Sequence, residues 1–206
     1  MRIKTPKSGY QKLTRAKARV IAHLIADGSM YRSRHNYNLR YEVTDEELLR
    51  EYYYDLVSVF GLKPHWSKNP SGKTGKIIPV VNLRSKIAFE DLLRYAKYFS
   101  ADWCLKEPFL SSGINIKREF LRSFADDEGS VIPQGKGALV RLYSINEKGL
   151  LQLQKLLLDF DISSKMVPGF GARRNVFALT IKEISKFSRR IGFNLSRKKA
   201  RLCEFL

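Results

Sequence analysis

The sequence contains an internal repeat with a period of about half the chain. A helical stretch in the first half ends at Asp27 to Ser29, and a similar stretch in the second half ends at Glu128 to Ser130. Positions 27 and 128 are 101 residues apart. Because each copy must form the same unit, any fold assigned to one half has to fit the other half as well.

The same order of elements follows each acidic helix ending. Alternating apolar and polar runs separated by turn residues predict a hairpin, a helix, a second hairpin and a third helix in each half. The sequence therefore predicts an α+β protein made of two pseudo-symmetric αββαββα repeats. The expected strands are 30–34, 38–43, 63–67, 76–84, 131–134, 138–144, 164–167 and 175–181, and the expected later helices are 45–60, 85–99, 147–160, 182–190 and 196–206.

The repeat also divides the chain. We expect a basic N-terminal extension at 1–13, a first repeat at 14–99, a linker at 100–114, and a second repeat with a C-terminal helix at 115–206. The alternation of apolar and polar residues along the expected strands is typical of antiparallel sheets that pack one face on helices. The other face of each sheet is expected to be exposed and charged.

The chain is strongly basic, with 38 Lys+Arg against 20 Asp+Glu and a formal net charge of +18. Residues 1–100 hold 19 basic and 9 acidic residues, so the surplus is spread over both halves. Such a surplus favours an anionic partner, nucleic acid first, although solvated Lys faces are the alternative. No apolar stretch is long enough to span a bilayer, and no apolar segment follows the basic N-terminus. We therefore expect a soluble, unsecreted protein without a membrane partner, in the cytoplasm with the nucleoid or in an organelle.

Asp27 and Glu128 each stand at the C-terminal end of a helix, where the macrodipole disfavours a negative charge. Positive charge is therefore expected to gather at these two ends. The alternative interpretation is structural, because glycine after a helix often takes the left-handed conformation that ends it. Small residues in the same helices would let the two helices pack closely and bring the two acids side by side; these are Ala22, Ala26 and Ser123.

Two neighbouring carboxylates in a basic protein form a ready site for Mg²⁺. Next to a DNA-sized basic surface, such a site indicates phosphodiester hydrolysis.

Residues 20–28 (VIAHLIADG) and 121–129 (LRSFADDEG) resemble the two signature helices of single-chain, two-repeat LAGLIDADG homing endonucleases. The resemblance extends from about residue 13 to the end of the chain. It implies a monomeric saddle with a central helix pair, whose two sheets lie on double-stranded DNA. It also implies that Asp27 and Glu128, with Gly28 and Gly129, hold Mg²⁺ or Mn²⁺ and cut one strand each of a long asymmetric site, leaving 3′ overhangs.

The resemblance also implies a basic residue near each scissile phosphate. Lys198 and Lys106 are the candidates, and ordinary solvated lysines are the alternative. His23 and Asp127 depart from the signature. We expect His23 to be packed, Asp126 to face solvent, and Asp127 either to support the metal site or to loosen the helix pair.

Base reading is expected from side chains on the exposed sheet faces, where Arg recognises guanine and amides recognise adenine. The candidates are Arg32, Arg34, Arg40, Lys76, Arg84, Gln134, Lys136, Arg141, Arg173 and Arg174. Two alternatives use the same scaffold: a DNA-binding regulator that does not cut, and a maturase that binds intron RNA.

Overall fold

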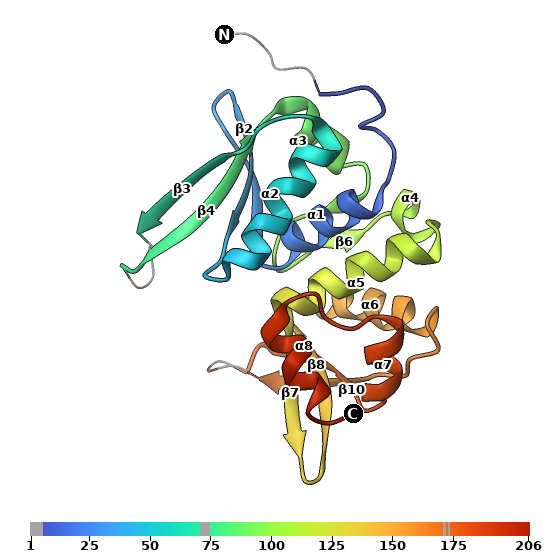
Figure 1. Cartoon of the computed structure of the whole chain (residues 1–206). Helices are drawn as coiled ribbons and strands as arrows, with labels where there is room; N and C mark the ends of the chain where they lie inside the picture. The colour runs from blue at the N-terminus through green and yellow to red at the C-terminus, as the bar shows by residue number, and fades with distance from the viewer. Residues whose placement is uncertain (1–5, 71–74, 171, 173) are drawn as a thin grey trace.

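The computed structural model describes residues 6–70, 75–170, 172 and 174–206. Two similar halves lie one above the other, and the helices α1 and α5 lie between them (Figure 1). The first half comprises α1 (Arg15–Ile25), β1 (Gly28–Ser33), β2 (Asn36–Glu42), α2 (Glu46–Phe60), β3 (His65–Pro70), β4 (Ile77–Arg84) and α3 (Lys86–Leu92). The second half comprises α5 (Ile114–Glu128), β7 (Gly129–Gln134), β8 (Gly137–Ser144), α6 (Glu147–Leu158), β9 (Lys165–Phe170), β10 (Val176–Ile181), α7 (Ile184–Arg190) and α8 (Ser196–Cys203).

The two halves contain sheets of the same topology. One sheet has the strand order β1-β2-β4-β3 and the other β7-β8-β10-β9. Every neighbouring pair is antiparallel. The predicted α+β fold, with two αββαββα repeats and a central helix pair, is confirmed.

Local sequence explains where several helices begin and end. The hydroxyl of Thr14 accepts a hydrogen bond from the Lys17 amide at the start of α1, and the side chain of Asn146 accepts one from the Gly149 amide at the start of α6. These contacts satisfy amide groups that have no partner within the helix. Helix α2 ends at Gly61, which is left-handed with φ 67°.

The segment between the repeats carries structure that the sequence did not predict. Helix α3 ends at Leu92 and not near residue 99. Beyond it, β5 (Ala96–Lys97) pairs with β6 (Cys104–Leu105), and α4 (Glu107–Leu110) precedes α5. Trp103 is only 2 % exposed in this segment, and its indole donates a hydrogen bond to Ser144 of the second repeat over 3.3 Å.

This docking gives a first prediction. A Cβ added at Gly149 would lie 2.4–2.6 Å from three ring atoms of Trp103. Replacing Gly149 with alanine is therefore expected to lower the free energy of unfolding by about 2 kcal/mol, as overpacking does in other cores. Urea denaturation measures the change. Gly113→Ala is the control, because no heavy atom lies within 4 Å of its added Cβ, and an equal loss in both variants would contradict the prediction.

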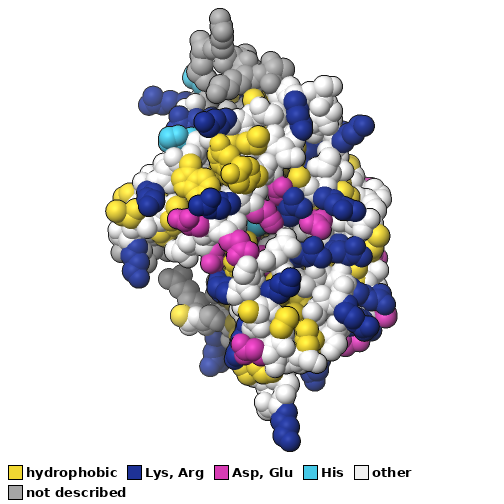
Figure 2. All heavy atoms as spheres, viewed as in Figure 1, with side chains coloured by type: hydrophobic (Ala, Val, Ile, Leu, Met, Phe, Trp, Pro, Cys, Tyr) yellow, Lys and Arg dark blue, Asp and Glu magenta, His cyan; other side chains and the backbone are white. Residues whose placement is uncertain are grey.

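Basic side chains cover both halves of the face seen in Figure 2, and acidic ones gather near its middle. This agrees with the even division of charge between the two halves of the sequence. Among the described residues, no helix combines the length and apolar character needed to cross a membrane.

Candidate active site between the two repeats

Helices α1 and α5 run side by side in the same direction. Arg19 of α1 bonds Glu119 of α5 over 2.8 Å, and His23 lies 2.9 Å from Asp127, one turn further along α1 and about two turns further along α5. Within the described part of the chain, no other pair of helices is packed together as extensively. The two helices therefore end together, and so do the acids that follow or complete them.

Small side chains allow this close packing. Ala22 and Ser123 are fully buried, and Ala26 is half-buried at the end of α1. Small residues let helix backbones approach closely. The placement of all three agrees with the predicted helix interface.

Gly28 and Gly129 are needed because a side chain would collide with the preceding helix, and not because the backbone is left-handed. Gly129 is extended, with φ −90° and ψ 151°, and its added Cβ would lie 2.4 Å from the Ala125 carbonyl oxygen. A Cβ at Gly28 would lie 2.7 Å from the Cα of Leu24. In each repeat the strand leaves so close to the helix end that only glycine fits, which corrects the interpretation of these glycines as left-handed caps.

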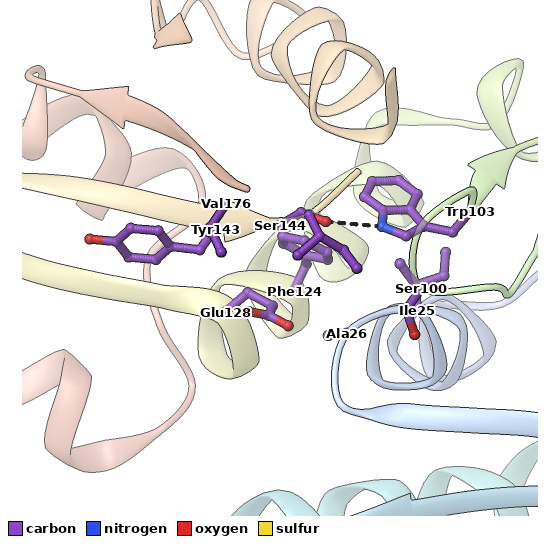
Figure 3. A pocket seen from close by; sticks show the side chains of 10 residues that line it. Ile25, Ala26, Ser100, Trp103, Phe124, Glu128, Tyr143, Ser144 and Val176 are labelled. Carbon is purple, nitrogen blue, oxygen red and sulfur yellow. Dashed lines mark hydrogen bonds between the residues drawn. The ribbon is translucent and has the colours of Figure 1, made fainter. Parts of the chain in front are cut away.

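Glu128 faces a small cavity between the repeats (Figure 3). The cavity measures about 240 Å³, and Glu128 is the charged group among the otherwise largely apolar residues that line it. These are Ile25, Ala26, Ser100, Trp103, Phe124, Glu128, Tyr143, Ser144, Ile145 and Val176.

Both acids have raised pKa values. Burial, and then the negative charge of Asp27, raises the pKa of Glu128 to about 8. Burial of the carboxylate and the charge of Asp127 raise the pKa of Asp27 to about 6, although Asp27 as a residue remains exposed to water. Burial is the first cause of both shifts, and the neighbouring carboxylates add to it, so the two acids lie close enough to influence each other.

Lys198 lies at this site but does not present a free ammonium group. Its Nζ donates to the carbonyl oxygens of Ala125, Asp126 and Asp127 over 3.2, 2.5 and 3.1 Å. A lysine has three N–H donors, and all three are used. Lys198 supplies the positive charge expected at the C-terminal end of α5. Its expected contact with a scissile phosphate stays a prediction, and it would require Lys198 to exchange one of these carbonyl partners.

Lys106 lies elsewhere. It is exposed, immediately before α4, and its Nζ donates to the carbonyl oxygen of Leu93 over 2.5 Å. Helix α4 precedes the first turn of α5, whereas Glu128 is the last residue of α5. A helix of that length spans about 20 Å. The structure therefore does not bring Lys106 to the acids, and the expected role is corrected.

Asp127 and His23 form a buried polar cluster that joins the repeats. Both side chains are fully buried, and the second carboxylate oxygen of Asp127 accepts a hydrogen bond from the hydroxyl of Tyr41. Burial opposes a charge on His23, but the adjacent Asp127 outweighs it and raises the pKa of His23 to about 9. Asp127 therefore ties the helix pair together. The sequence marked it as unusual without revealing its partners.

Asp126 does not face solvent as the sequence suggested. It is 1 % exposed, and its carboxylate accepts hydrogen bonds from the amides of Asn194 and Leu195 over 3.0–3.1 Å. The loop before α8 thereby folds back on the end of α5. On its other side this segment bonds α2, through Ser196 to Glu47 over 3.0 Å and Arg197 to Asp45 over 2.7 Å. The C-terminal helix thus joins the two repeats beside the acids. The sequence predicts this helix, but no motif predicts its contacts with both repeats.

The donor set suits a hard divalent cation. Mg²⁺ prefers oxygen ligands and is commonly held by one or two carboxylates together with water and substrate phosphates. Asp27 and Glu128 supply two such carboxylates close to each other. Among the residues that the structure describes, no group of three His, Cys, Asp or Glu side chains is placed to hold an ion alone. The site fits an ion whose coordination is completed by water and a phosphate.

Each sheet has an open face, by which we mean the strand residues that point away from the helices. Residues directly opposite one another in a ladder share a face. Arg40 and Arg84 lie on the open face of the first sheet, and Gln134 and Arg141 on that of the second. Arg40 also pairs with Glu42 over 2.5 Å.

The other predicted DNA-contacting residues are placed differently. Arg32 shares the helix-side face with Met30, because Gly28, Met30 and Arg32 alternate with the open-face residues, and its guanidinium lies over the ring of Tyr37. Its expected place on the exposed face is therefore corrected. Arg34, Lys76, Lys136 and Arg174 lie in turns or just outside strands, and Arg173 falls outside the described residues.

The comparisons with known proteins agree with this architecture. Residues 115–192 match the family model described as a LAGLIDADG-like domain. No curated protein matches the chain significantly.

Solved structures of homing endonucleases have a similar fold. A mesophilic variant of the homing endonuclease I-DmoI superposes with a TM-score of 0.66 at 14% identity, covering 87% of this chain and 96% of that chain. The homing endonuclease I-WcaI, bound to its DNA recognition sequence, superposes with a TM-score of 0.67 at 13% identity, covering 94% and 90%. Full-length DUF199/WhiA from Thermatoga maritima superposes with a TM-score of 0.60 at 15% identity, covering 97% and 62%.

Proposed function

The chain is a two-repeat protein of the LAGLIDADG fold, with a LAGLIDADG-like domain in its second half, and we propose that it is a site-specific DNA endonuclease. Its substrate is a long asymmetric site in double-stranded DNA, bound by one protein molecule across both open faces. It hydrolyses one phosphodiester bond in each strand with Mg²⁺ or Mn²⁺ and leaves 3′ overhangs.

The convergence of Asp27 and Glu128 carries this proposal. They come from different repeats, meet at the ends of two parallel helices, and have pKa values raised to about 6 and about 8. A chain with a net charge of +18 has no general need to concentrate negative charge at one point. A divalent cation provides a reason for it, because the cation binds both carboxylates and can then accept a DNA phosphate as a further ligand. Structures of I-DmoI in complex with DNA have been solved with Mn and with Ca, which supports divalent ions as ligands of this fold.

The protein's own groups have distinct roles in this proposal. Asp27 and Glu128 hold the ion, and Lys198 holds the carbonyl end of α5 so that Glu128 keeps its place. When bound, the ion supplies Lewis acidity for the attack of water on phosphorus and for departure of the 3′ oxygen. The largely apolar residues beside Glu128 lower the local dielectric constant, which strengthens the attraction of its carboxylate to a cation.

The proposal is tested by incubating a randomised duplex library with Mg²⁺ and sequencing the cut ends. The native chain is compared with Asp27→Asn and Glu128→Gln, and with Glu90→Gln as a control on the exposed surface of α3. We expect one long site to be cut by the native chain and by the control. We expect either acid-to-amide variant to lose double-strand cleavage by at least a hundredfold while still binding the site.

Two outcomes would contradict the proposal. Enrichment of one site by binding, with no cut ends from the native chain, would leave a DNA-binding protein that does not cut. Preferential binding of a structured RNA over duplex DNA would instead favour an RNA-binding role.

A further inference from the structure

The open faces of the two sheets carry different chemistry, although the sheets share one topology. On the first sheet most open-face side chains carry hydrogen-bonding groups, and Tyr31, Ile78 and Val80 are the apolar or aromatic exceptions on the described strands. The hydrogen-bonding side chains include four asparagines and two arginines: Asn36, Asn38, Asn69, Asn82, Arg40 and Arg84. The amide of Asn82 donates to the side-chain oxygen of Asn38 over 3.2 Å, so these groups form a polar layer across neighbouring strands.

The open face of the second sheet carries more apolar side chains than the first, beside the polar residues Ser130, Lys165 and Thr180. The ladder places five apolar or aromatic residues there: Ile132, Leu139, Tyr143, Val167 and Ala178. Leu139 and Ala178 are buried, at 5 % and 0 % exposed, but neither belongs to the core formed with the helices. Val80 has the same character on the first sheet, at 1 % exposed. The apolar side chains that remain accessible on the second open face are Ile132, Tyr143 and Val167, which are half-buried.

Aromatic contacts hold Arg141 on this open face. The guanidinium of Arg141 lies 4.9 Å from the centre of the Phe170 ring, and the Tyr143 ring meets Phe170 edge to face with centres 5.6 Å apart. Arg141 Nε is buried and has no hydrogen-bond partner among the described residues. Gln134, at the outer end of β7, is the one amide side chain on the described strands of this open face, compared with four asparagines on the first.

Hydrogen-bonding side chains and apolar side chains recognise different features of a base pair. Asparagine makes paired hydrogen bonds to adenine and arginine to guanine, whereas apolar side chains contact the methyl group of thymine. A hydrogen-bonding face therefore discriminates among all four base pairs. An apolar face responds mainly to the presence of that methyl group.

We propose that the two half-sites of the DNA are read by different chemistry. The β1–β4 sheet reads its half-site by hydrogen bonds to base edges, and the β7–β10 sheet reads its half-site by apolar contact with thymine methyl groups. The inference rests on the proposed DNA binding through the open faces. It adds a prediction of which half of the DNA site depends on thymine.

The test removes the methyl groups alone. After a site has been selected from the library, deoxyuridine replaces thymidine in one half-site at a time, and the dissociation constants are compared. Burying one methyl-sized group contributes about 0.8 kcal/mol, which corresponds to about a fourfold change in affinity. We expect about a fourfold loss for each contacted thymine under the β7–β10 sheet and a smaller total loss under the β1–β4 sheet, where apolar side chains are fewer.

The half-sites are assigned to sheets with Arg84→Ala. Arg84 is exposed on the first open face, so its removal should relax base preference only in the half-site under that sheet. Val167→Thr keeps the side-chain shape and removes apolar character; it should reduce the effect of deoxyuridine. Ser67→Thr, at the corresponding place on β3, should not change it, and thermal melting verifies that both variants fold.

The results separate this inference from the proposed function. Equal losses in both half-sites, a loss only under the β1–β4 sheet, or no thymine under the β7–β10 sheet would overturn the inference while leaving DNA binding intact. Absence of cleavage with the expected deoxyuridine pattern would overturn the endonuclease and leave the inference standing. Absence of any duplex binding would overturn both.

Discussion

Replacing Asp127 with alanine is expected to lower the free energy of unfolding by about 3–5 kcal/mol at pH 7. The change leaves His23, fully buried, without its carboxylate partner, and leaves the Tyr41 hydroxyl without its acceptor. Removing one member of a buried ion pair typically costs this much, because the remaining charge is uncompensated. The melting temperature should fall by roughly 6–20 °C, measured by circular dichroism.

A double substitution distinguishes the ion pair from a loss of packing. His23→Leu in the Asp127→Ala background removes both buried polar partners, and should recover part of the lost stability. Asp159→Ala is the surface control. Its carboxylate pairs with Lys117 but is 41% exposed, so its removal should change stability by about 0.5 kcal/mol or less. A loss of similar size in Asp127→Ala and Asp159→Ala would contradict the buried-pair account.

The pH dependence of the same pair has a definite sign. The pKa of His23 is raised from 6.5 in the unfolded chain to about 9 in the folded protein. The stability that its charged form contributes is complete below pH 6.5 and is lost as pH rises through about 9. The difference in stability between the native chain and Asp127→Ala should therefore shrink between pH 7 and pH 9.5.

Glu128→Gln is expected to stabilise the metal-free protein at pH 8 while abolishing its response to Mg²⁺. The folded pKa of Glu128 is about 8, against 4.5 in the unfolded chain, so the unfolded state releases its proton at lower pH. Stability of the native chain should thus fall as pH rises from about 4.5 to 8. A shift of this size corresponds to at most about 5 kcal/mol, and because Glu128 is half-buried and reached by water we expect about 3 kcal/mol.

Thermal melts with and without Mg²⁺ measure both effects. A ligand present at a hundred times its dissociation constant stabilises the folded state by about 2.7 kcal/mol. The native chain should gain stability in Mg²⁺ at pH 8, and Glu128→Gln should gain little or none. Equal stabilisation of both proteins by Mg²⁺ would show that the ion binds elsewhere.

The sequence was sufficient to predict the fold because the repeat constrained every element twice. The paired acidic-glycine endings, the Gly61 stop and the alternating strands all follow local rules that a single sequence displays. The segment at 93–105 was missed for the opposite reason. Its two-residue strands, β5 and β6, are too short to show a pattern, and the adjacent Trp103 finds its partner in the second repeat, far along the chain.

The candidate site was predictable in its acids and less so in their surroundings. Asp27 and Glu128 stood out because they oppose the helix dipole at equivalent positions. The contacts of Asp126 and Lys198 depend on the C-terminal helix returning to α5 across about 70 residues of sequence, as the separations of 68–73 positions between partners show. Arg32 was misplaced because a one-residue change of register moves a side chain to the other face of a sheet.

The most direct test of the central claim is a strand-resolved cleavage assay on the selected site. Each strand carries its own label, and the native chain, Asp27→Asn, Glu128→Gln and the double variant are incubated with the duplex and Mg²⁺. We expect the native chain to cut both strands, each single variant to cut at most one, and the double variant to bind the site without cutting. Cleavage of both strands at the native rate by either single variant would contradict the assignment of Asp27 and Glu128 as the metal-binding pair.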